Sequence, residues 1–118
     1  MANEISVGLF LTADKGGAKV NRSESTTIDM TGASLTHGVQ QVPTGGEVLV
    51  ESDVLGTVGV CFVKNLDSSN YITIGSHTSS NHTIKLLAGE STIFRAAGSV
   101  YAASQTGTIN VEYILIET

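Results

Sequence analysis

The sequence is short of the residues from which catalytic and binding sites are usually built. Its 118 residues include one cysteine, one proline and no tryptophan, and aromatic residues make up 5% of the chain. A single cysteine excludes an internal disulfide, so the fold does not depend on the redox compartment. Few aromatic residues argue against binding of sugars or single-stranded nucleic acid, because such sites use aromatic side chains as stacking platforms.

Charged residues are scarce as well, at 14% of the chain, and 6 basic against 11 acidic residues give a formal net charge of -5. Binding to duplex nucleic acid needs clustered lysine and arginine, which this sequence lacks. No stretch approaches the roughly 20 apolar residues that span a bilayer. The opening Met1-Ala-Asn-Glu has none of the basic residues of a signal peptide. We therefore expect a protein made in a cytoplasm, with no nucleic-acid partner and no membrane.

No group of residues has the spacing of a catalytic or metal site. The three histidines are expected to be solvated, because nothing fixes them in a ligand geometry: they are His37, His77 and His82. Cys61 lies among apolar residues in mid-strand, where a thiol behaves as a small hydrophobic group. Asp67 and Glu90 flank turns, where carboxylates ordinarily accept hydrogen bonds from the backbone. We expect no enzymatic activity, no metal, no cofactor and no small-molecule substrate.

What the sequence does contain is β-strand pattern throughout. About nine or ten short stretches of β-branched and aromatic residues recur at a spacing of roughly 8–12 residues, with glycine and polar turns between them. This pattern predicts an all-β fold, an antiparallel β-sandwich of jelly-roll type. We expect one domain over residues 1–118, with residues 1–4 as an N-terminal arm. The segment 52–57 fits either a helical turn or the end of a strand.

Three hairpins are expected within this sandwich. The central one covers residues 58–75, with Asp67, Ser68 and Ser69 in its turn. The others pair residues 39–42 with 48–50, and residues 83–87 with 92–96. In residues 58–65, Val60 and Phe62 face one way while Cys61, Val63 and Asn65 face the other, so the strand is expected to be covered on both faces.

The opening of the chain predicts a half-buried strand over residues 5–12, in which Ile5, Val7, Leu9 and Leu11 share one face. Phe10 lies on the other, polar face, either as a tolerated surface residue or as part of a subunit contact. A turn at Asp14-Lys-Gly-Gly follows, then a short polar strand at 18–22 and another alternating strand at 25–31.

The last strand, residues 108–116, is the most β-prone segment of the chain. Ile109, Val111, Tyr113 and Leu115 form an unbroken apolar face, and Ile114 and Ile116 add apolar side chains to the otherwise polar face. Such a strand at a sheet edge would favour aggregation. We expect it to be central in a sheet or covered by another subunit.

Several of these segments together resemble a family of small virion proteins of tailed bacteriophages. The resemblance covers about half of the chain, and the opening Met1-Ala-Asn-Glu-Ile-Ser-Val is similar in style. The segments that carry it are Gly59-Val-Cys-Phe-Val-Lys-Asn-Leu-Asp-Ser-Ser-Asn-Tyr-Ile-Thr-Ile-Gly, Lys85-Leu-Leu-Ala-Gly-Glu-Ser-Thr-Ile-Phe-Arg, Val100-Tyr-Ala and Val111-Glu-Tyr-Ile-Leu-Ile-Glu.

Members of that family occur among capsid cement (decoration) proteins and among tail or baseplate components. The resemblance implies a virion protein that forms a homotrimer on the outer surface of a phage head and reinforces contacts between major capsid proteins. The residues expected to contact another subunit or the capsid are Met1, Ala2, Asn3, Glu4, Phe10, Ile114 and Ile116.

Two other functions remain open at this point. A tail, fibre or baseplate module would use the polar loop 76–81 as its recognition surface. A secreted carbohydrate-binding sandwich is the third class, and the missing aromatic residues and signal peptide count against it.

Overall fold

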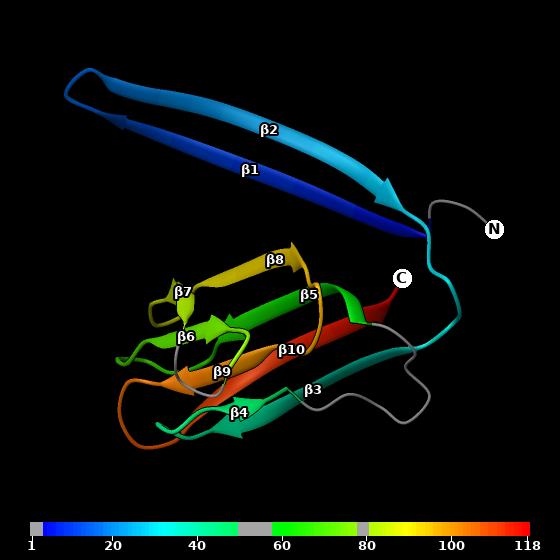
Figure 1. Ribbon diagram of the computed structural model, residues 1–118. Coiled ribbons are helices and arrows are strands. Elements are labelled where there is room, and N and C mark those ends of the chain that lie inside the picture. The colour runs from blue at the N-terminus through cyan, green and yellow to red at the C-terminus, as the bar shows by residue number, and fades with distance from the viewer. Residues whose placement is uncertain (1–3, 50–57, 78–80) are drawn as a thin grey trace. The chain divides into compact units, whose positions relative to one another are not determined.

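The computed structural model describes residues 4–49, 58–77 and 81–118, and in this part of the chain strands, turns and bends are the regular structure. The chain divides into a hairpin unit, Met1–Thr31, and a sandwich unit, Gly32–Thr118. The strands of both units are labelled in Figure 1. The predicted arm residues 1–3 and the ambiguous segment 52–57 lie outside the described residues. No membrane-spanning helix is found in the described ranges.

The hairpin unit consists of two long antiparallel strands, β1 (Ile5–Lys15) and β2 (Ala18–Ile28), joined at the predicted glycine turn. Gly16 and Gly17 both have positive φ, at 56° and 95°, a conformation that glycine adopts without steric cost. Pairing runs without a bulge from Ile5 opposite Ile28 to Lys15 opposite Ala18. Strand β2 therefore merges most of the two segments that were predicted as separate strands.

Burial along β1 differs from the prediction. Ile5 and Val7 are buried, but Leu9 and Leu11, which share their face, are exposed. The alternation of the sequence correctly indicated which side chains share a face. It could not indicate that β1 hydrogen-bonds only to β2, in a two-stranded sheet.

The sandwich unit contains eight strands in two antiparallel sheets. One sheet has the order β3-β10-β5-β8 and the other β4-β9-β6-β7. The strands are β3 (Leu35–Val42), β4 (Glu47–Val48), β5 (Val58–Asn65), β6 (Ile72–Gly75), β7 (His82–Leu86), β8 (Ser91–Arg95), β9 (Tyr101–Ser104) and β10 (Ile109–Glu117).

This strand order is that of a jelly roll, as predicted. Only β6 and β7 are consecutive strands in one sheet, so the other six of the seven connections cross between the sheets. Two Greek keys wound in this way define the jelly roll. The whole sandwich lies within Gly32–Thr118. The first two strands pair with each other and form a separate sheet.

All three hairpins predicted for the sandwich are wrong as pairings, although their strands are correct. In each case the two strands lie in opposite sheets: β3 and β4, β5 and β6, and β7 and β8. A polar turn between two apolar strands fits a hydrogen-bonded hairpin and a crossing between stacked sheets equally well. Local sequence does not distinguish these two outcomes.

The core lies between the two sheets. The last strand contributes Ile109, Val111, Tyr113 and Leu115, which are all buried, as their alternation predicted. Strand β10 is also central, between β3 and β5. The inward side of β5 contributes Cys61 and Val63. The opposite sheet adds Ile72, Ile74, Leu86 and Ala102.

One end of the sandwich is closed by Asn65, the last residue of β5, which is fully buried. Its side-chain nitrogen donates to the carbonyl oxygens of Asn70 at 2.8 Å and Leu86 at 3.1 Å, and its side-chain oxygen accepts from the backbone nitrogen of Asp67 at 2.8 Å. Its backbone pairs with Glu90 and Gly89. The amide thus joins the end of β5 to the end of β7 and to the crossing between the sheets.

Replacing this amide by the carboxylate of the same shape tests the arrangement. Asn65→Asp removes both side-chain donors and places a negative charge against two carbonyl oxygens, so the free energy of unfolding should fall by about 2–4 kcal/mol at pH 7. Urea denaturation measures the change. The matched control is Asn110→Asp, at an exposed position of β10. Equal denaturation midpoints for the two variants would contradict the role assigned to Asn65.

Candidate functional site

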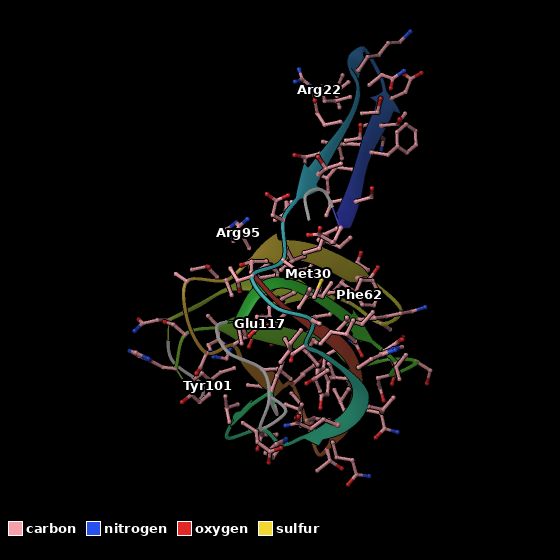
Figure 2. The ribbon with its side chains drawn as sticks, turned by 90° about the vertical axis from the view of Figure 1, so that its right-hand side faces the viewer. Arg22, Met30, Phe62, Arg95, Tyr101 and Glu117 are labelled. Carbon is pink, nitrogen blue, oxygen red and sulfur yellow. The ribbon has the colours of Figure 1, made fainter. Side chains whose placement is uncertain are left out.

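The outer face of the sheet β3-β10-β5-β8 carries apolar side chains across all four of its strands. The register places Ile114 between His37 and Phe62, and Phe62 lies opposite Ile93 of β8. In the neighbouring row, Ile116 lies between Leu35 and Val60. Figure 2 shows the Phe62 side chain among those of the sandwich unit. We call this surface the apolar sheet face, and its members are Leu35, Val39, Val60, Phe62, Ile93, Ile114 and Ile116.

Several members of this face are accessible. Leu35 is 53% exposed and Val39 is 61% exposed, both on the edge strand β3. Phe62, Ile93, Ile114 and Ile116 are half-buried, and Val60 is buried. A contiguous apolar surface of this kind is typical of a protein–protein contact, because water is released when it is covered.

Charged groups border the apolar sheet face at Glu112. Its carboxylate lies 2.8 Å from the ring nitrogen Nε2 of His37 on β3, and Lys64 of β5 is its direct neighbour in the register. Both the histidine and the carboxylate are partly accessible to water, so this pair contributes little to stability. The pair lies between Val39 and the other members of the apolar sheet face, so this surface also contains polar groups.

The outer face of the other sheet is polar by comparison. Thr73 of β6 lies between Lys85 and Ala103, and its hydroxyl contacts the ring nitrogen Nδ1 of His82 at 2.9 Å. The Lys85 ammonium lies over the ring of Tyr71, 4.2 Å from its centre. The two outer faces of the sandwich thus differ in chemistry, and only one of them is suited to a dry contact.

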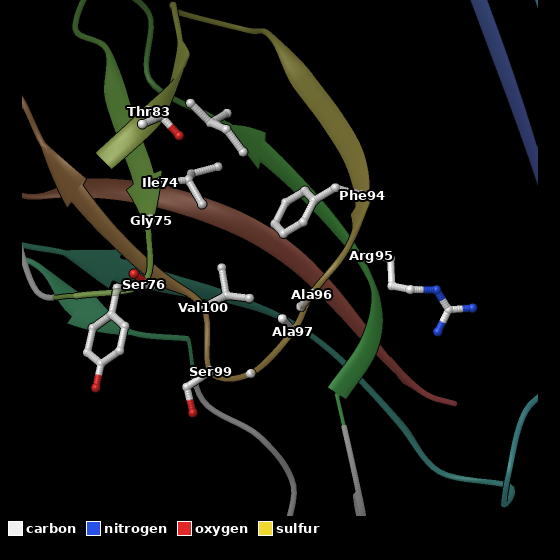
Figure 3. Close-up of a pocket in the computed structure, with 13 residues that line it drawn as sticks. Ile74, Gly75, Ser76, Thr83, Phe94, Arg95, Ala96, Ala97, Ser99 and Val100 are labelled. Carbon is white, nitrogen blue, oxygen red and sulfur yellow. The ribbon is translucent and has the colours of Figure 1, made fainter. Parts of the chain in front are cut away.

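A pocket opens between the two sheets beside β7 and β8 (Figure 3). The side chains of Ile74, Phe94 and Val100 point into it, while the Arg95 guanidinium points away. Arg95 instead donates to the Thr118 hydroxyl at 3.1 Å. Among the described residues that line the pocket, no convergent set of ionisable groups is present. The lining of this pocket suits an apolar group. It has no convergent ionisable side chains that would activate a bound substrate.

The histidines are more tightly held than the sequence predicted. His82 begins β7, and besides its contact with Thr73 its Nε2 donates to the carbonyl oxygen of His77. Gly75 is required beside it, because a side-chain carbon at that position would meet the His82 ring at 2.5 Å. Within the ranges that the structure describes, no three histidine, cysteine or acidic residues are grouped as metal ligands. Cys61 is buried in the core, as predicted.

The predicted contact residues are distributed over both units. Ile114 and Ile116 lie together on the apolar sheet face, whereas Phe10 projects from β1 and is 76% exposed. Glu4 accepts a hydrogen bond from the backbone nitrogen of Met30 at 3.0 Å, within the hairpin unit. Met1, Ala2 and Asn3 lie outside the described residues. Sequence reasoning missed Leu35, Val39 and Ile93 as members of the same face as Ile114, because the strand order that brings them together is not local information.

The predicted role of two turn carboxylates is confirmed. Asp67 accepts from the backbone nitrogens of Asn70 at 2.7 Å and Ser69 at 3.0 Å. Glu90 accepts from the backbone nitrogen of Leu87 at 2.8 Å. The hydrogen bonds from Asn70 and Ser69 favour the ionised carboxylate, so they hold the pKa of Asp67 below its ordinary value of 3.8.

Comparisons of the chain with protein-family models, curated proteins and solved structures found no match.

The lowered pKa of Asp67 predicts a pH dependence of stability. A carboxyl group whose pKa is lower in the folded state stabilises the fold above its unfolded value of about 3.8, and this contribution is lost as pH falls through the lowered folded value. Asp67→Asn should therefore reduce the fall in melting temperature between about pH 5 and pH 2. Asp14→Asn, at an exposed position near the end of β1, is the charge-matched control. A wild-type pH profile in the Asp67 variant would contradict the prediction.

Proposed function

We propose that this chain is a structural virion protein of a tailed bacteriophage. In this proposal it is a capsid cement, or decoration, protein that oligomerises on the outer surface of the phage head and reinforces contacts between major capsid proteins. The jelly-roll fold supports the proposal, since viral capsid domains are among the proteins built on it. The resemblance of the segments from Gly59 to Glu117 points in the same direction.

The observation that carries the proposal is the apolar sheet face. Leu35, Val39 and Ile114 lie on the outside of a sheet whose other side is already packed in the core. A second apolar side on a sheet of this size indicates a partner, because leaving such surface in water is unfavourable. A capsid shell contains many copies of the same binding surface. Many modest contacts with it together reinforce the shell mechanically.

The proposed partners are a second and third copy of this chain, in a homotrimer, and the major capsid protein. The net charge of -5 does not suit nucleic acid or an anionic membrane surface, and the apolar pocket has no groups that would act on a substrate. The protein would be made in the host cytoplasm and would function on the virion, without enzymatic activity.

Copy number tests the position on the particle. Quantitative mass spectrometry of particles purified from the source strain should give an abundance close to that of the major capsid protein. A few to dozens of copies per particle would instead favour the tail, fibre or baseplate alternative. Absence from purified particles would contradict a virion role altogether.

Charge substitutions test the apolar sheet face. Leu35→Asp and Ile116→Asp should each weaken self-association by about 2 kcal/mol or more, roughly thirtyfold in affinity, because a buried charge would face apolar groups. Sedimentation over a range of concentrations measures the effect. Leu87→Asp is the matched control, at an apolar residue that is 50% exposed but lies outside this face. Unchanged sedimentation of both test variants would count against the proposed contact.

A further inference from the structure

The hairpin unit carries an apolar knob and a hollow on one face of the same strand. Successive residues on one face of β1 are Ser6, Gly8, Phe10 and Thr12, and Phe10 is the most exposed of the exposed large apolar side chains in the described residues. A hollow at Gly8 is lined by Ser6, Ser25 and Thr27, which share the face of Phe10, and by Val7 and Thr26 between them. The knob and the hollow lie two residues apart, a distance of about 7 Å along a strand.

Nothing within the chain requires glycine at position 8. Its φ is not among the positive values, and the register from Ile5 to Lys15 has no bulge there. A side-chain carbon built at Gly8 would meet no atom within 4 Å. Glycine inside a strand weakens the strand, and a common reason for its presence is close approach of another chain.

From this we infer that the hairpins of two copies pack face to face through Phe10, with each ring seated in the hollow over Gly8 of the other copy. A two-fold axis midway between positions 8 and 10, perpendicular to the strands, brings Phe10 of each copy over Gly8 of the other. This is the reciprocal relation of a symmetric interface. The same axis places Ser23 of one copy against Ser25 of the other, since these residues lie opposite Phe10 and Gly8.

The size of the contact sets its strength. With this axis residues 5–13 of the two copies overlap, a ribbon about 31 Å long and about 10 Å wide, so a face-to-face pair buries roughly 600 Å² in total. This lies below the roughly 1,000 Å² of a stable interface, so the pair is a weak dimer in dilute solution. The contact matters where copies are held close together, and here the inference rests on the proposed shell function.

The pairing also explains how the hairpin remains ordered. An isolated two-stranded hairpin is only marginally stable in water. In β1 and β2 most residues are exposed. A partner that covers the Phe10 face turns one ribbon into half of a two-layer structure, which removes the Phe10 ring from water.

The test exchanges phenylalanine and glycine between positions 8 and 10 of the full chain. Sedimentation equilibrium at high concentration measures the dimer. Gly8→Phe alone should lose the concentration-dependent dimer, because two rings then meet at each contact. Phe10→Gly alone should lose it as well, because no ring fills the hollow. An equimolar mixture of the two variants should recover it, because every ring of one chain then faces a glycine of the other.

Val20→Ser is the control, since Val20 lies opposite Ala13 on the other face of the ribbon and should leave the dimer intact. Circular dichroism checks that all variants fold. Wild-type association of both single variants, or failure of the mixture to recover the association that they lost, would overturn the inference. The proposed shell function would survive that result, because self-association through the apolar sheet face is tested separately with Leu35→Asp and Ile116→Asp.

Discussion

The sandwich depends on the buried side-chain amide of Asn65. Each of its polar groups has a partner, and these partners belong to the crossing after β5, the end of β7 and the turn before β8. Because side chains alternate along a strand, fixing Asn65 inward also fixes Cys61 and Val63 inward. It therefore directs Phe62 outward, into the same row as Ile114. The apolar sheet face is a consequence of this one orientation.

The two outer surfaces of the sandwich differ in the side chains that they expose. The sheet β4-β9-β6-β7 presents threonine, lysine and a hydrogen-bonded histidine, which remain favourable in water. The sheet β3-β10-β5-β8 presents leucine, valine, isoleucine and phenylalanine next to the pair His37 and Glu112. Apolar residues on both sides of β10 and β5 give that sheet two packing surfaces, one internal and one available to another protein. A protein that functions through contacts is the simplest account of this distribution.

Much of the fold could be predicted from the sequence, because it depends on alternation that is visible locally. Most of the strands, the inward face of residues 109–115 and the turn roles of Asp67 and Glu90 were confirmed, whereas two strands predicted at 18–22 and 25–31 are mostly merged in β2. Strand pairing in the sandwich was not predictable, since the crossings from β3 to β4, β5 to β6 and β7 to β8 have the same local pattern as hairpins. The exposure of Leu9 and Leu11 was missed for a related reason: burial depends on what covers a face, and β1 pairs only with β2. Ile114 and Ile116 were found from sequence because they interrupt a polar face, whereas Leu35 and Val39 join them only through the register.

The central claim is that the apolar sheet face is covered by protein on a phage head. The most direct measurement is an image reconstruction of particles that carry this chain, compared with particles that lack it. The account predicts difference density on the outer surface of the head, with the face of Leu35, Ile114 and Ile116 turned toward neighbouring subunits. Difference density confined to the tail, or a sandwich on the head with this face turned to solvent, would contradict it.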